Sequence, residues 1–119
     1  MKRGSLRLEE YLKHILKAIN RIQKYCDDMS EISFLASEIT QDAVIRNFEI
    51  IGEASKKIEH VATPEFLALN PDLPLTFAYD MRNLLTHGYY KVDLEVVWKT
   101  IEADLPNLKT LVEKALMDL

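Results

Sequence analysis

The chain has 119 residues, 48% of them hydrophobic, and carries 15 basic and 19 acidic side chains for a net charge of −4. Only three glycines and four prolines interrupt it, so we expect one all-helical domain over residues 1–119. An acidic protein does not coat itself in nucleic acid, and any binding of nucleic acid must therefore use a local basic site.

The distribution of apolar residues and the single cysteine indicate the cellular compartment of the protein. No apolar run approaches the ~20 residues needed to cross a bilayer, and the basic start leads into an amphipathic stretch rather than a signal peptide. Cys26 is the only cysteine and has no metal-ligand companion at close spacing. We therefore expect a cytoplasmic protein without a membrane partner.

A first helix is predicted from about Leu6 to Asp27, with His14 on its solvent side. Its apolar residues recur at alternating steps of four and three, which is typical of antiparallel bundle packing. These residues are Leu8, Leu12, Ile15, Ile19, Ile22 and Cys26. Ser30–Ser37 then reads as a short turn or helix in which Phe34 and Leu35 form an apolar plug.

A long second helix is predicted over roughly Glu38–His60. Its expected buried stripe is Ile39, Val44, Phe48, Ile51, Ala54 and Ile58. Gly52 costs about 1 kcal/mol relative to alanine in mid-helix, so we expect another backbone or a substrate to approach it closely. Arg46, Glu49 and Glu53 form a polar ridge, which on its own is best read as a solvated face. Two glutamates without an E-x-x-H partner make a poor metal site, and we expect no metal and no cofactor.

Shorter elements follow the long helix. Thr63 before a proline is a good start for a short helix over Pro64–Leu69. Asp93 is a good N-cap for a later helix in which Trp98 lies on the apolar stripe as a core anchor. Pro106 either kinks that helix or begins the next one.

Four polar side chains gather near the end of another predicted helix. That helix is indicated by apolar residues at three- and four-residue steps, namely Leu75, Ala78, Met81 and Leu85. Gly88 is its expected stop, and Arg82, Asn83, His87 and Tyr89 lie around this end. On ideal geometry Asn83 shares a face with His87, whereas Arg82 lies about 140° away. Arg82 and His87 therefore meet over one substrate only if the helix end unwinds or a second subunit contributes.

Three blocks of the sequence carry a family resemblance. Arg82–Tyr89 looks like an R-N-x-x-x-H-x-Y signature, Ala43–Ala54 is similar to a mid-chain helix, and Val92–Trp98 is followed by Asp-Leu-Pro at 104–106. Together, and in this order, they resemble the HepT-like branch of the HEPN superfamily over nearly the whole chain. The resemblance implies an antiparallel bundle of about four to five main helices. It also implies a homodimer whose motif helices meet near a two-fold axis.

The motif residues suit the handling of a phosphodiester. The guanidinium of Arg82 matches phosphate oxygens, and the imidazole of His87 exchanges protons near neutral pH. Without a metal, the accessible reaction is RNA transesterification, in which the 2′-hydroxyl attacks the adjacent phosphorus. The resemblance implies the same activity, a metal-independent ribonuclease toxin paired with a minimal nucleotidyltransferase antitoxin. It makes Arg82 and His87 the catalytic pair and Asn83 a positioning residue.

The resemblance also implies roles for four further residues. Arg46, Asn47 and Glu53 become positioning residues behind the catalytic pair, with Glu53 able to hold an arginine by a bidentate contact. Tyr89 becomes the acceptor of AMP, which the partner transfers from ATP to silence the ribonuclease. Two other interpretations stay open: a non-catalytic binding module that docks on a nucleotidyltransferase, and a plain helical scaffold.

Overall fold

Residues 3–76, 81 and 93–119 of the computed structural model are described here, with side chains from residue 6 onward. Every regular element in these ranges is helical, which confirms the predicted all-α class. The elements are α1 (Arg3–Tyr25), α2 (Glu31–Leu35), α3 (Glu38–Val61), α4 (Pro64–Leu69), α6 (Leu94–Lys99), the π-helical turn η1 (Thr100–Asp104) and α7 (Leu105–Met117).

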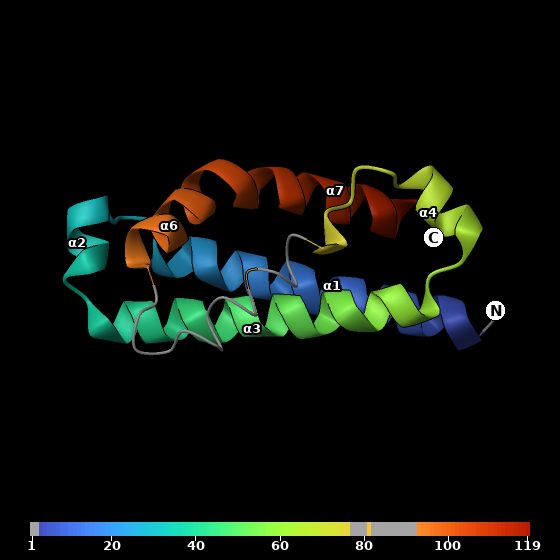
Figure 1. Ribbon diagram of the computed structural model, residues 1–119, viewed down its shortest axis with the longest axis horizontal. Helices are drawn as coiled ribbons and strands as arrows, with labels where there is room; N and C mark the ends of the chain where they lie inside the picture. Colours follow the sequence, from blue (N-terminus) through green and yellow to red (C-terminus); the bar gives the residue numbers. More distant parts are fainter. Residues whose placement is uncertain (1–2, 77–80, 82–92) are drawn as a thin grey trace.

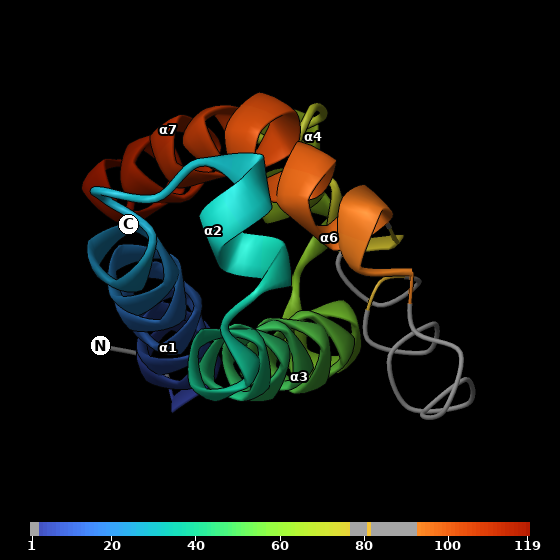
Figure 2. The same cartoon turned by 90° about the vertical axis from the view of Figure 1, so that its left-hand side faces the viewer.

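The two long helices α1 and α3 run antiparallel side by side, and α7 packs along α1 above this pair (Figures 1 and 2). The predicted apolar stripe of α1 is buried throughout, and Lys109 Nζ of α7 lies 3.4 Å from Gln23 Oε1 of α1. His14 is exposed, as predicted. The residues buried in the shared core include Leu12, Ile15, Ile19, Ile22, Val44, Phe48, Ile51, Ile58, Val97, Leu105 and Val112.

The first turn of α3 departs from the predicted stripe. Ile39 is 85% exposed, so its placement in the core was wrong. It precedes Val44 by five residues, which on an ideal helix turns the side chain about 140° away from the stripe. The remaining stripe residues recur at steps of three and four and are buried.

The short helix α2 closes one end of the bundle (Figure 2). Phe34 is fully buried, and its ring centroid lies 5.3 Å from that of Trp98, which confirms Trp98 as a core anchor. Leu35 is 37% exposed, so the plug consists of Phe34 alone. Gln41 Nε2 of α3 donates to the carbonyl oxygens of Phe34 (2.9 Å) and Leu35 (3.0 Å), which satisfies the C-terminal end of α2.

The predicted caps are in place. Thr63 Oγ1 accepts a hydrogen bond from the Phe66 amide at 3.1 Å, and Asp93 Oδ1 accepts from the first turn of α6. Pro106 lies in the first turn of α7, directly after η1. Because proline cannot donate and its ring crowds the carbonyl four residues earlier, the chain widens here: the Leu105 amide bonds the Thr100 oxygen, five residues back.

None of the helices in the described ranges is both long and apolar enough to span a membrane. The long helices instead carry one apolar stripe each, and that stripe is used in packing.

Candidate functional site

The motif residues Arg82, Asn83, His87 and Tyr89 lie outside the described residues, as does the predicted helix stop at Gly88. The candidate site is therefore built from the residues that sequence analysis placed behind the catalytic pair. These are all on α3.

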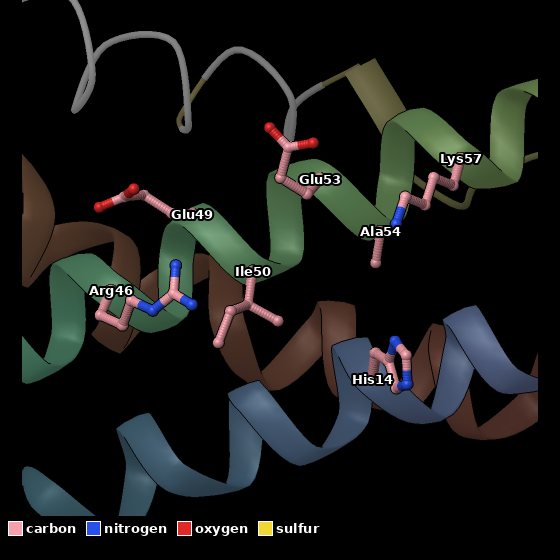
Figure 3. Close-up of a pocket in the computed structure, with 7 residues that line it drawn as sticks. All are labelled: His14, Arg46, Glu49, Ile50, Glu53, Ala54 and Lys57. Atoms are coloured by element: carbon pink, nitrogen blue, oxygen red, sulfur yellow. The ribbon is translucent and has the colours of Figure 1, made fainter.

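A hollow of about 330 Å³ lies over the polar side of α3 where that helix runs beside α1 (Figure 3). Its lining consists of His14, Arg46, Glu49, Ile50, Glu53, Ala54 and Lys57. The structure thus brings Arg46 and Glu53 to one surface, as their spacing on the helix requires. His14 reaches the same hollow from α1.

The lining mixes charges of both signs. Arg46, Glu49, Glu53 and Lys57 follow one another along α3 at steps of three and four, so cations stand at both ends of the row and carboxylates in the middle (Figure 3). The guanidinium and the ammonium can bind phosphate oxygens, while the carboxylates can accept hydrogen bonds from hydroxyl or guanidinium groups. The hollow is suited to binding and orienting a polar ligand.

One wall of the hollow is fastened by aromatic contacts that sequence analysis missed. The ring of Tyr11 meets that of His14 edge-on, with 6.4 Å between their centroids, and Lys57 Nζ lies 5.7 Å from the Tyr11 ring centroid. A cation at this distance from an aromatic face is attracted to it. His14 is exposed, as predicted, but the α1 periodicity alone does not reveal that it also faces α3.

Asn47 lies apart from the hollow, on the buried side of α3. It is 4% exposed, and its Nδ2 donates to the Ala43 carbonyl oxygen at 2.8 Å. Its Oδ1 is buried and has no hydrogen-bond partner among the described residues; the same holds for Ser55 Oγ. Buried polar atoms are ordinarily paired, and Asn47 is not among the residues that line the hollow.

Two buried groups outside the lining of the hollow have structural explanations. Gly52 is buried, as expected for a position of close packing. Burial raises the pKa of the Cys26 thiol, because desolvation disfavours the thiolate, and so makes this group a poor nucleophile near neutral pH. In the described ranges, no three His, Cys, Asp or Glu side chains converge as metal ligands would.

Comparison with known proteins defines the class. The family model for Ribonuclease HepT-like proteins matches residues 15–115. The chain belongs to this family, a class of ribonucleases, and the resemblance of its three sequence blocks to HepT-like proteins is confirmed.

Individual relatives are similar over most of the chain. A Thermococcus cleftensis protein named "Probable ribonuclease HepT" is 42% identical over 106 residues, which cover 89% of this chain and 93% of that protein. Several Methanocaldococcus jannaschii proteins that carry RNase in their names are also similar, and two of them show the range of coverage. One is 32% identical across 89% of this chain and 94% of its own length. The other, also named as a gamma-glutamylcyclotransferase, is 38% identical across 92% of this chain but only 47% of its own length. No solved structure matches significantly.

Proposed function

We propose that this protein is a metal-independent endoribonuclease toxin that cleaves RNA with Arg82 and His87 as its catalytic pair. The observation that carries the proposal is the family match over residues 15–115, which includes both positions. Their residue types supply what the reaction needs, a permanent cation and a group that exchanges protons near neutral pH.

The reaction is a transesterification within the RNA chain. His87 takes the proton from a 2′-hydroxyl, whose oxygen attacks the adjacent phosphorus. Arg82 stabilises the additional negative charge on the phosphorane, and Asn83 positions the reacting group. The bond to the 5′-oxygen breaks, and that oxygen takes up a proton as it leaves. The products are a 2′,3′-cyclic phosphate and a 5′-hydroxyl end.

The residues of α3 support this chemistry from behind. Arg46 binds a phosphate next to the scissile one, and Glu53 holds Arg82 in orientation by a bidentate contact. Asn47 acts through a neighbouring group, in keeping with its burial and its unpaired Oδ1. The roles given to Arg46 and Glu53 are supported by their position in the lining of one hollow.

The active form in this proposal is a homodimer. On ideal helix geometry Arg82 and His87 diverge by about 140°, and a two-fold axis near the motif brings the arginine of one protomer toward the histidine of the other. Analytical ultracentrifugation at micromolar concentration tests this point. A dimer is expected, and a monomer that still cleaves RNA would contradict the composite cleft.

The proposed control is AMP transfer to Tyr89 by a nucleotidyltransferase antitoxin of the minimal type. The added phosphodiester and base would fill the phosphate site and repel RNA, by the logic of phosphorylation switches. Peptide mass spectrometry after incubation with partner and ATP should find AMP on Tyr89, and the Tyr89→Phe variant should stay active. AMP found only on Tyr90, or on neither tyrosine, would refute the assignment.

The second candidate is a binding module that docks on the nucleotidyltransferase without cleaving RNA. The lining of the hollow supports it, because charges of both signs suit contact with a nucleotide or a protein partner and do not require a reaction. The module and the enzyme differ in one assay.

That assay incubates labelled RNA with purified protein in EDTA. The wild type should cleave, and His87→Ala should lose a factor of about 10² to 10⁴ in rate, as is usual for a positioned acid or base. His60→Ala is the matched control, because His60 is an exposed histidine in the last turn of α3, and it should cleave like the wild type. Full activity in His87→Ala, or no cleavage by the wild type, would overturn the ribonuclease proposal.

A further inference from the structure

The outer side of α1 carries a concentration of positive charge that the net charge of the chain conceals. Between Lys13 and Lys24 lie four of the fifteen basic side chains and none of the nineteen acidic ones. All four, Lys13, Lys17, Arg21 and Lys24, are exposed. We call this set the basic strip.

The basic strip forms one continuous surface. Its four cations line a shallow hollow of about 380 Å³, with Leu16 and Asn20 between them. On ideal geometry they fall within about 80° of arc and along about 16 Å of helix axis. This arc is opposite the buried stripe of α1, and no described element lies over it (Figure 2).

The charges of the strip are largely uncompensated. Lys13 Nζ lies 3.4 Å from Glu9 Oε1 in an exposed pair. Among the described residues, the other three cations have no acidic partner. A row of like charges stabilises neither the helix nor the bundle, and its concentration on one face of an acidic protein suits an anionic ligand.

Two aromatic rings flank the strip on the side that faces α3. His14, whose ring contacts Tyr11, lies one turn from Lys17 and also lines the hollow over α3. Tyr25 follows Lys24 directly, and its side chain is 40% exposed. A row of cations with exposed rings at its ends combines the two features by which proteins hold single-stranded nucleic acid without sequence preference.

We propose that the basic strip binds the backbone of single-stranded RNA, so that the strand runs from the hollow over α3 past His14 and along α1. This inference rests on the proposed function for the identity of the substrate. The cations stand at axial steps of about 4 to 6 Å, which suits the successive phosphates of an extended strand. A protein partner fits less well, because interface centres are depleted in lysine and the only apolar residue here, Leu16, is half-buried.

The test measures RNA binding separately from cleavage. Fluorescence anisotropy with a short oligouridine, in the His87→Ala background, gives the dissociation constant at salt concentrations between about 50 and 200 mM. The strip variant is Lys17→Gln with Arg21→Gln. The matched control is Lys99→Gln with Lys114→Gln, which removes the same charge from exposed positions on α6 and α7. The contacts of Lys114 are a surface ion pair with Asp118 and a hydrogen bond to the Leu69 carbonyl oxygen, neither of which involves α1.

The strip variant should bind RNA on the order of tenfold more weakly, and the slope of log affinity against log salt should fall by about 0.7 for each lost phosphate contact. The control should match its parent. Equal affinity and slope in the strip variant and the control would overturn the proposal, and dimer dissociation in the strip variant alone would then assign the strip to a protein contact. If RNA binding depends on the strip but protein that retains His87 does not cleave RNA, the ribonuclease proposal is contradicted and the RNA-binding role of the strip still holds.

Discussion

The two sides of α3 differ in how tightly the rest of the molecule packs against them. On the buried side, Val44, Phe48 and Ile51 are at most 2% exposed and pack in the core shared with α1. On the polar side, Arg46 and Glu53 are exposed and line a hollow. The buried side holds the fold together, whereas the polar side is available for ligands at little structural cost.

This difference predicts that substitutions on the two sides separate stability from activity. Changes to the apolar residues of the buried side should lower the free energy of unfolding and reduce activity only as far as the protein unfolds. Changes on the polar side should alter activity in a fully folded protein. Three variants of α3 test the separation.

Phe48→Ala should have the largest effect. A buried phenylalanine replaced by alanine loses about 3–5 kcal/mol, which is much of the 5–15 kcal/mol that stabilises a typical domain. Urea unfolding followed by circular dichroism measures the loss. Glu59→Ala, at an exposed position of the same helix, is the control and should stay within about 0.5 kcal/mol. A Phe48→Ala protein as stable as this control would contradict the packing described for α3.

Arg46→Gln should act on catalysis instead. We expect kcat/KM for RNA to fall about tenfold, in line with a lost charge-assisted contact, while the urea midpoint remains that of the wild type. Lys99→Gln, which removes an exposed cation from α6, should leave both quantities unchanged. An Arg46→Gln enzyme with wild-type kcat/KM would show that the ridge is only a solvated face.

Gly52→Ala should have the smallest effect. It tests whether another group packs closely against the backbone at Gly52 or whether nothing approaches it. The added methyl group crowds a packed position at a cost of about 1–3 kcal/mol, of which helix propensity returns about 1 kcal/mol. We expect a net loss near 1 kcal/mol in urea unfolding. Ser55→Ala, buried on the same helix, should be neutral or stabilising because its hydroxyl has no partner in the described ranges. If Gly52→Ala stabilises the protein, nothing approaches this backbone closely.

The fold was predictable wherever apolar spacing and capping residues agreed. The stripe of α1, the caps at Thr63 and Asp93, and the burial of Trp98 all follow from local rules. Ile39 failed because it was added to the α3 stripe at a five-residue step, which breaks the helical period. The π turn before Pro106 was missed because proline allows several local responses, among them a kink or a wider turn.

The site was predictable only as far as one helix allows. Spacing alone placed Arg46 and Glu53 on one face, and the structure puts them in one hollow. The contribution of the facing helix α1 to the hollow, through His14, was not predicted, because the pattern of one helix does not specify its neighbour. The burial of Asn47 likewise depends on packing rather than on its position in the sequence.

The central claim is that RNA itself supplies the nucleophile, without a metal. Mass spectrometry of the ends produced by wild-type protein in EDTA tests this most directly, with the same oligonucleotide carrying 2′-deoxyribose throughout as the control. The account predicts 2′,3′-cyclic phosphate and 5′-hydroxyl ends from RNA and no cleavage of the deoxy strand, since the attacking oxygen is missing. Ends bearing a 5′-phosphate, or cleavage of the deoxy strand, would contradict it.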